Sequence, residues 1–522
     1  MRFDKDIGQI YRRMHSLLTI RNGKARELKR EYEEFRPVLS EIEMAISQLS
    51  APMRVAVAGY MKAGKSTLMN AILGKKIVLT GSLITTYTPT WFRYSDEESL
   101  EIVFEDGRRV GGLRLDDLAR WTAIESRGIN PEIDQVSYVI LNYPNEMLKQ
   151  IELIDTPGLF SPEEKDSERT IRLLGLGDIS NANQLGQSQV SLADAIVYVF
   201  SSNFKVSDMC AVKAFTSTPI NAIAAFTKLE QSFWNPLSHQ ISPLEAIAPI
   251  VRRNEETLKD ELYCIIPVVA KMVEGFSVIN DMEWSQLLSI ADVPTDQLVK
   301  SLMSPKRFEE TPFEGTTQAV RLRLYELLDR YGIYCVAQGI RGAISRQDMP
   351  DYLYSMSGVD ILVDRLRDHF GLRSFIIKTE SAFSRIERQI QKIKYDSACC
   401  AAAKKMCVQL EQELENGRNL RDYRELTLLR HFYEGKIRFP EGKDNEEFLR
   451  LLGEQGNGAA RKLGLDSGAA VDEMYRRVIT VHEHWGILAN DPTLGRAECS
   501  AAQAVLDSVN DMRYHIEMLS QF

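Results

Sequence analysis

The spacing of apolar residues near the N-terminus predicts helix. From Lys24 onward, apolar side chains recur at alternating steps of four and three residues, at Leu28, Tyr32, Phe35, Leu39, Ile42, Ile46 and Leu49. This spacing places them on one side of a helix, so residues 1–50 should form helices that pack against other helices. Pro37 falls within the stripe, and we expect it to kink or interrupt the helix.

Short apolar runs replace the helical pattern after residue 51. Seven runs predict strands, at 53–59, 99–106, 136–144, 150–158, 193–201, 220–228 and 263–271. The first, MRVAVAG, is nearly all apolar, as a buried central strand should be. Helical patterns separate most of the runs. This alternation indicates an α/β domain with a mainly parallel sheet flanked by helices.

Helical periodicity dominates the rest of the chain. Residues 357–371 predict a capped amphipathic helix that ends at Gly371. A second apolar stripe then begins with Ile376, Phe383, Ile386, Ile390 and Ile393. We therefore expect three segments: N-terminal helices at 1–50, an α/β domain at 51–372, and C-terminal helices at 373–522. The simplest arrangement joins the first and third segments in one α-helical bundle.

Composition narrows the classes of protein to consider. The 522 residues are 44% hydrophobic and 26% charged, as in a soluble globular protein of several domains. A net charge of -9 gives no overall attraction to nucleic acid, so no such partner is expected. The seven cysteines include no C-x-x-C pair, which favours free thiols in a reducing compartment. Without a signal peptide or a membrane-spanning run, the expected location is cytoplasmic.

A phosphate-binding motif follows the first predicted strand. Residues 59–67, GYMKAGKST, fit the pattern G-x-x-x-x-G-K-[ST] between a strand and a helix. In such a loop backbone N–H groups surround the phosphates, Lys65 reaches the β and γ oxygens, and Ser66 ligates Mg²⁺. The predicted nucleotide-binding residues in this loop are Gly59, Tyr60, Met61, Lys62, Ala63, Gly64, Lys65, Ser66 and Thr67.

A later strand ends in a candidate metal ligand. The run at 150–158 finishes with Asp155, Thr156, Pro157 and Gly158. In P-loop proteins an Asp at this strand end holds Mg²⁺, usually through water, and the Gly can offer its N–H to the γ-phosphate. The four residues alone are a common turn. Their place after a P-loop indicates a nucleotide site with Asp155 on the metal side.

Two further motifs are similar to base-reading loops. The segment FTKLE ends in Glu230, where the guanine-reading pattern T-K-x-D has Asp. An Asp accepts two hydrogen bonds from guanine that adenine cannot offer, while the neighbouring lysine covers the base. Glu230 keeps both acceptors but is longer by roughly 1.3 Å. We expect weakened discrimination for guanine, with base contacts from Thr227, Lys228, Glu230, Ala270 and Lys271.

The order of these motifs is that of G1, G3, G4 and G5 in GTPases. With LTGSLITTYTPTWFRY at 79–94, they resemble the large GTPases of the bacterial dynamin-like group. That group has a switch I segment T-G-x-L-P-x-T-x-x-P-T, in which Ile84 replaces the first proline here. The matching residues are Thr80, Gly81, Leu83, Thr86, Pro89 and Thr90. The resemblance covers about residues 50–275 by motif and the remainder only by layout.

The resemblance implies roles for particular residues. Thr86 aligns with the switch I threonine that closes over Mg²⁺ and helps to position the attacking water. Lys62 stands where eukaryotic dynamins carry a serine that helps to hold a monovalent cation, and we hypothesise that its ammonium group supplies that charge. The alternative is a solvent-facing lysine. Leu159 replaces the water-orienting glutamine of many small GTPases, so catalysis would have to come from elsewhere.

The predicted function is Mg²⁺-dependent binding and hydrolysis of GTP, with Lys62, Lys65 and Thr86 as catalytic residues and Ser66, Thr86 and Asp155 as metal ligands. The resemblance implies homodimers through G domains, self-assembly, and contact with the inner face of the membrane or a partner dynamin-like protein. Two alternatives stay open: a nucleotide-gated switch with slow hydrolysis and no membrane activity, and an ATPase, permitted by Glu230.

One segment of the C-terminal region is a weak candidate for membrane contact. Residues 436–448 are charged and turn-rich, and we expect a solvated connection between helices there. The segment could instead be a tip that touches a membrane. Ile437 and Phe439 are the apolar side chains it offers for insertion.

Overall fold

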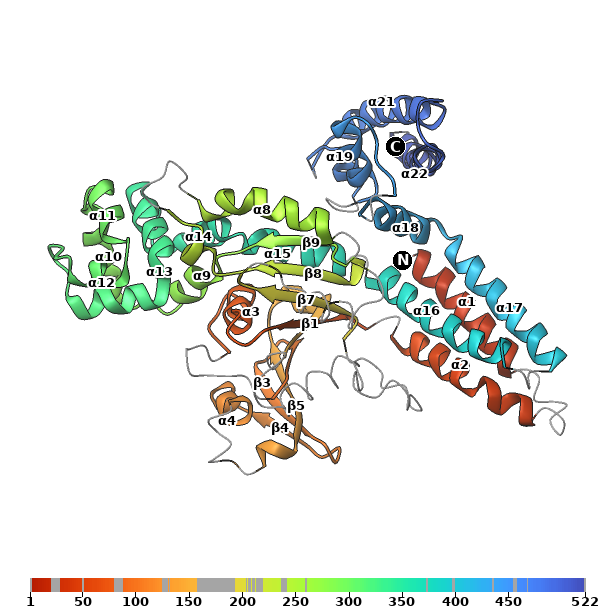
Figure 1. The fold of residues 1–522 in the computed structure, drawn as a ribbon, viewed down its shortest axis with the longest axis horizontal. Helices are drawn as coiled ribbons and strands as arrows, with labels where there is room; N and C mark the ends of the chain where they lie inside the picture. Colours follow the sequence, from red (N-terminus) through yellow and green to blue (C-terminus); the bar gives the residue numbers. More distant parts are fainter. Residues whose placement is uncertain are drawn as a thin grey trace. The chain divides into compact units, whose positions relative to one another are not determined.

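The computed structural model describes the chain except residues 1, 20–28, 49–50, 79–87, 124–129, 131, 157–192, 203, 205–207, 209–211, 213–218, 236–241, 259–260, 372–373, 397–399, 434–435, 454–457, 467 and 521–522. The chain divides into two compact units (Figure 1). One consists of Arg54–Arg367, and the other combines Met1–Met53 with Asp368–Phe522. The first unit is thus inserted between two parts of the second.

The inserted unit is built on one nine-stranded sheet of order β4-β3-β5-β2-β6-β1-β7-β8-β9. The strands are β1 (Met53–Gly59), β2 (Thr90–Tyr94), β3 (Ser99–Phe104), β4 (Arg109–Leu113), β5 (Val136–Tyr143), β6 (Ile151–Asp155), β7 (Ala195–Phe200), β8 (Ala222–Phe226) and β9 (Cys264–Pro267). All seven predicted runs contain a strand. The strands β2 and β4 were not predicted.

Strand directions confirm a mainly parallel sheet. β1, β7, β8 and β9 pair in parallel in that order, and every residue of β7 and β8 is buried. β2 pairs in parallel with β5 but antiparallel with β6. β3 is antiparallel to both β4 and β5. The predicted phosphate and base loops follow β1, β8 and β9, which all run in the same direction. Because parallel strands have their carboxyl ends at the same edge of a sheet, these loops lie along one edge.

Helices flank this sheet, and further helices continue the unit beyond one end of the sheet, as Figure 1 shows. They are α3 (Lys65–Leu73), α4 (Leu118–Thr122), α7 (Leu229–Ser232), α8 (Pro243–Leu258), α9 (Ala270–Phe276), α10 (Asp281–Asp292), α11 (Thr295–Ser301), α12 (Pro305–Glu310), α13 (Gln318–Arg341), α14 (Met349–Ser357) and α15 (Val359–Arg365). Short 3₁₀ turns span Leu115–Asp117, Ile133–Gln135, Glu146–Lys149 and Pro219–Asn221. A π-helical turn, Leu366–Gly371, follows α15.

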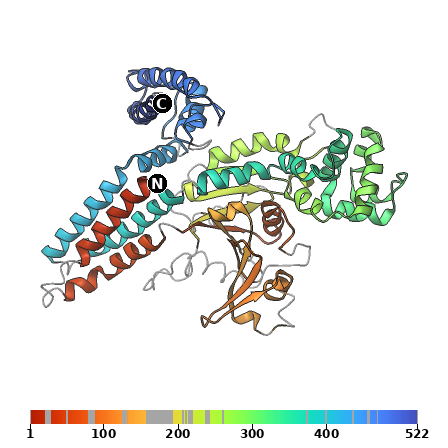
Figure 2. The ribbon, with the colours of Figure 1, turned by 180° about the vertical axis from the view of Figure 1, so that it is seen from behind.

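The second unit contains the predicted bundle of N-terminal and C-terminal helices. α1 (Arg2–Thr19), α2 (Lys29–Gln48), α16 (Ser374–Lys394) and α17 (Ala401–Arg418) lie side by side in both views (Figures 1 and 2). Their shared core includes Tyr11 and Phe383, whose rings meet edge to face. Pro37 lies inside α2 and does not end it, so of the two expected effects, a kink or an interruption, the structure excludes the interruption.

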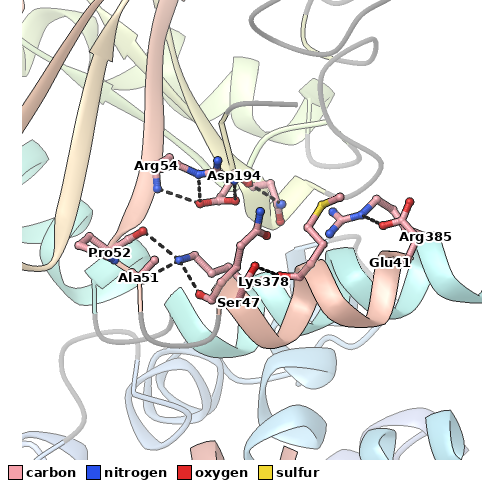
Figure 3. A network of polar contacts seen from close by, with 11 residues as sticks. Glu41, Ser47, Ala51, Pro52, Arg54, Asp194, Lys378 and Arg385 are labelled. Atoms are coloured by element: carbon pink, nitrogen blue, oxygen red, sulfur yellow. Dashed lines mark hydrogen bonds and ion pairs between the residues drawn. The ribbon is translucent and has the colours of Figure 1, made fainter. Parts of the chain in front are cut away.

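A buried lysine holds the end of α2 (Figure 3). Lys378 of α16 is 8% exposed, and its Nζ donates to the carbonyl oxygens of Gln48, Ala51 and Pro52 at 3.4, 2.7 and 2.9 Å. Gln48 is the last residue of α2, whereas Ala51 and Pro52 lie between α2 and β1. The ammonium group therefore holds the chain where it leaves α2, near the negative end of the helix dipole.

The remaining C-terminal helices form a second core rather than extending the first. They are α18 (Arg421–Tyr433), α19 (Gly442–Leu451), α20 (Ala459–Lys462), α21 (Val471–Ala489) and α22 (Arg496–Ser520). Ile437 and Phe439 are only 2% and 3% exposed in this core. The idea that they insert into a membrane is therefore wrong. Among the described residues, we find no helix long and apolar enough to cross a membrane.

Candidate functional site

The predicted phosphate loop joins β1 to α3. Gly59 ends β1 beside Val199 of β7, and a Cβ on Gly59 would lie 2.2 Å from the Val199 carbonyl oxygen. No side chain fits at this close approach of two strands. The loop ends at Gly64, which has φ of 97° and precedes the first helical residue, Lys65. The strand–loop–helix context predicted from the sequence is therefore present.

Lys65 turns its ammonium group into this loop. The residue is 8% exposed, and its Nζ donates to the carbonyl oxygens of Gly59 at 3.2 Å and Tyr60 at 3.1 Å. Burial lowers the pKa of Lys65 to about 8, although the nearby Asp155 carboxylate acts in the opposite direction. A desolvated cation held by neutral carbonyls would gain strongly from phosphate oxygens, which carry full negative charge.

The end of β6 places Asp155 next to the phosphate loop. Asp155 is completely buried, and its charge acts on Lys65. The following residue, Thr156, donates from Oγ1 to the carbonyl oxygen of Val57 in β1 at 2.9 Å. This hydrogen bond fixes the carboxyl end of β6 to the strand that carries the loop. Thr86, Gly158 and Leu159 lie outside the described residues, so their roles stay predictions.

The loop after β8 is tied to the phosphate loop by one hydroxyl group. Thr227 is buried, and its Oγ1 lies 2.6 Å from the Ala63 carbonyl oxygen and 3.0 Å from that of Phe200. Lys228 follows in the left-handed conformation, with φ of 58°, and precedes α7. The sequence predicted that Thr227 belongs to the base loop. It gave no sign of the bond to Ala63, which joins two distant segments.

Charges from three loops converge around Lys228. Burial lowers the pKa of Lys228, the carboxylate of Glu230 raises it, and the charges of Lys271 and Lys62 lower it further. Lys62 is exposed and has φ of 63°. Ala270, the first residue of α9, is buried next to Lys271. The structure thus brings together the phosphate loop and both predicted base loops.

A buried asparagine near the site was not predicted. Asn70 of α3 accepts hydrogen bonds at Oδ1 from the backbone N–H groups of Ile77 and Val78, at 2.9 and 2.8 Å. Its Nδ2 donates to the Val78 carbonyl oxygen and to Glu274 Oε1 of α9, both at 2.8 Å. Every polar position of the amide is used. The asparagine fixes the chain immediately before the predicted switch I segment.

A comparison with protein-family models matches residues 55–215 to the dynamin family. The match spans the phosphate loop, the end of β6 and the strand β7 that contacts Gly59. Over these residues the inserted unit is similar to the G domain of the dynamin family. Within this G domain, β8, α7, α9 and the helices that follow them lie beyond the matched residues.

Known proteins similar to this dynamin-like chain include one of nearly the same length. Isoniazid-induced protein IniC of Mycobacterium tuberculosis is 25% identical over 90% of this chain and 92% of its own. Dynamin-like protein 2 of Campylobacter jejuni is 33% identical over 25% of this chain and 20% of its own. A solved structure of an oligomerised bacterial dynamin pair covers 99% of this chain and 76% of its own, at 13% identity and a TM-score of 0.31.

Proposed function

We propose that this protein binds and hydrolyses GTP with Mg²⁺ and couples its nucleotide state to self-assembly and membrane contact. The observation that supports this best is the buried Lys65, desolvated in the phosphate loop next to the Asp155 carboxylate. A lysine and a carboxylate so placed match the needs of a triphosphate and its metal ion. The family match of residues 55–215 supports the same proposal.

The residues on the metal side fit Mg²⁺, which prefers oxygen ligands. The buried carboxyl of Asp155 and the hydroxyl of Ser66, at the start of α3, would hold it, with Thr86 of the predicted switch I as a further ligand. When bound, Mg²⁺ neutralises charge that develops on the phosphate oxygens. Lys65 acts on the same oxygens, and the backbone of residues 59–67 orients them.

The base loops support a guanine nucleotide. Glu230 is the second residue of α7, the helix that follows Thr227 and Lys228. Because the Thr227 hydroxyl ties this part of the chain to the phosphate loop, Glu230 stands where a base-reading acid is expected. Lys228 and Lys271 are close enough to one another for their charges to interact, as expected for lysines that flank one base. These features favour GTP as the nucleotide in the proposal, with Glu230 accepting hydrogen bonds from the base.

Self-assembly and membrane contact rest on the family likeness. In the proposal, G domains pair head to head, and the helical unit transmits the nucleotide state. Since Ile437 and Phe439 are buried, membrane contact would need other apolar side chains. Ile487 of α21 and Tyr514 of α22 are 68% and 61% exposed. Co-sedimentation with liposomes in the presence of GTP tests this part, and a protein that stays in solution would favour the switch without membrane activity.

Phosphate release from GTP, with and without Mg²⁺, tests the proposed activity. We expect Lys65→Ala to lose at least about ten-fold in nucleotide affinity and nearly all hydrolysis, because its charge-assisted contacts to phosphate are removed. Lys75→Ala is the matched control, since Lys75 is an exposed lysine paired with Glu98 just beyond α3. Equal activity of Lys65→Ala and the native protein would overturn the proposal.

An ATPase is the second candidate function, and Glu230 is the observation that favours it. Its carboxyl is buried, and burial raises its pKa to about 7, which favours the protonated form more than in an exposed carboxyl. A neutral carboxyl group offers one donor and one acceptor, which is the pattern that adenine requires. Measuring ATP beside GTP in the same assay separates the two functions.

A further inference from the structure

Helix α13 contains a break at Asp329. Within the span Gln318–Arg341, this residue alone has non-helical angles, φ of 56° and ψ of 177°. Such a conformation is strained for any residue with a Cβ, and it persists where the surroundings impose it. Asp329 is 6% exposed. Its Oδ1 accepts a hydrogen bond from the Arg330 N–H at 2.7 Å, and its Oδ2 lies 3.5 Å from Lys271 Nζ.

Tight packing of α9 against α13 explains how the break is held. A Cβ on Gly275 of α9 would lie 2.0 Å from the Leu327 carbonyl oxygen, so the two backbones are in direct contact. On the other side of the break, a Cβ on Gly332 would lie 2.7 Å from the Met272 Cβ. Asp329 lies between these two contacts. α9 begins at the predicted base loop, and Asp329 is thereby fixed near Lys271.

The break is also tied to the other base loop. Arg330 donates from Nε to the Glu230 carbonyl oxygen at 2.7 Å and from Nη2 to that of Gln231 at 2.5 Å. Glu230 is 2% exposed, and its Oε2 is buried without a hydrogen-bond partner among the described residues. A buried carboxylate oxygen in this position is suited to accept a hydrogen bond from a bound group. Guanine would supply the N–H donors it lacks.

Charged groups from several elements lie around the Glu230 carboxyl. Lys228 is in its own loop, Lys271 in α9, and Asp329 and Arg330 in α13. α8 also packs on α7 and carries the acidic Glu245 in its first turn. The pKa of Glu230 is raised to about 7, chiefly by burial and also by the charge of Asp329, while a backbone hydrogen bond and both lysines act in the opposite direction. The negative charge of Asp329 therefore disfavours the ionised form of Glu230.

The two forms of Glu230 suit different bases. A carboxylate presents two acceptors, which match the N1–H and N2–H₂ donors of guanine. A protonated carboxyl presents one donor and one acceptor, which match N1 and N6–H₂ of adenine. We propose that Glu230 and Asp329 are an acidic pair that sets base preference: Glu230 contacts the base, and Asp329 is a positioning residue that decides which base Glu230 accepts. This inference rests on the proposed nucleotide-binding function and deepens it.

Calorimetric binding of GDP and ADP to the full chain tests the pair, because neither nucleotide needs hydrolysis to be measured. The quantity compared is the ratio of the ADP to the GDP dissociation constant, in which phosphate ionisation common to both cancels. For the native protein we expect this ratio to rise at least about ten-fold between about pH 6 and about pH 8, as Glu230 loses its proton.

Three variants sharpen the test. Asp329→Asn keeps the shape and tolerates positive φ, and it should move the rise to lower pH, because the opposing charge is gone. Glu230→Gln fixes one donor and one acceptor, so its ratio should stay low and independent of pH. Asp360→Asn alters another half-buried carboxyl, on α15, and should behave like the native protein.

The outcomes are distinct. A native ratio that does not change with pH, or an Asp329→Asn profile identical to the native one, overturns the inference while leaving GTP binding intact. If neither GDP nor ADP binds, the proposed function fails and the inference fails with it. Should Asp329→Asn not fold, the contrast between the native protein and Glu230→Gln still decides, since a flat native profile overturns the pair.

Discussion

At the scale of single residues, Thr227 joins the two halves of the nucleotide site. Its hydroxyl group lies 2.6 Å from the Ala63 carbonyl oxygen, and the side chain is 3% exposed. Thr227→Val has the same shape but no donor, so the Ala63 carbonyl is left without this partner. We expect a loss of about 1–2 kcal/mol in unfolding free energy and a roughly ten-fold weaker affinity for GDP. Urea unfolding and calorimetry measure the two effects.

Thr227→Ser is the matched control, because it keeps the donor and removes only a methyl group. It should retain most of the GDP affinity. If Thr227→Val binds GDP as well as the native protein, the hydroxyl bond does not organise the site, and Thr227 serves only to fill space next to Phe200.

At the scale of elements, Asn70 connects α3 and α9 to the chain that leaves Val78. Asn70→Ala removes, in a buried place, the side-chain partner of two backbone N–H groups and one carbonyl, and one hydrogen-bond partner of the Glu274 carboxyl. We expect a cost of about 2–4 kcal/mol in unfolding free energy, because several buried polar groups lose their partners at once. Urea unfolding of the full chain measures it.

A second asparagine provides the comparison. Asn142 of β5 donates one hydrogen bond, to Ser99 Oγ at 2.9 Å, in a half-buried position. Asn142→Ala should cost about 1 kcal/mol or less. Equal costs for the two variants would show that the several bonds of Asn70 add nothing to its stability effect.

The sequence predicts most clearly those strands that form an unbroken apolar run. β7 and β8 are buried along their whole length and were predicted from such runs. β4 was missed because its sequence, RVGGL, has two glycines and is largely exposed. β2 was missed because it is short and follows a segment of sequence rich in threonine. Strands such as β2 and β4, which are formed mainly by pairing with neighbouring strands, have only a weak pattern in their own sequence.

The candidate site likewise contains residues that could be predicted from the sequence and residues that could not. The phosphate loop was predictable because its residues are consecutive and each has a local requirement, such as the glycine at 59. Asn70, Asp329 and the hydroxyl bond of Thr227 were not predictable, since each acts through a partner far away in the sequence. The sequence before Asp329 has an ordinary helical pattern and gives no sign of the break in α13. The break depends on the close contact of α9 with α13, which only the structure shows.

At the scale of the whole molecule, each unit has a hydrophobic core of its own. The G domain core gathers around β7, β8, α9 and α13. The helical unit has the core of α1, α2, α16 and α17 and the separate core of α18–α22. Residues 1–53 and 368–522 must come together across the inserted G domain, so the helical unit depends on contacts between distant parts of the chain.

We therefore expect calorimetric unfolding to show separate transitions with different responses. GDP at a hundred times its dissociation constant should stabilise only the G domain transition, by about 2.7 kcal/mol. Phe383→Ala should lower only the transition of the core formed by α1, α2, α16 and α17, by about 3–5 kcal/mol, because Phe383 is fully buried between Tyr11 and Tyr423. Phe226→Ala in β8 is the counterpart, and it should lower the transition that responds to GDP. A single transition shifted by all three changes would mean that the units unfold as one, because separate cores respond only to changes within them.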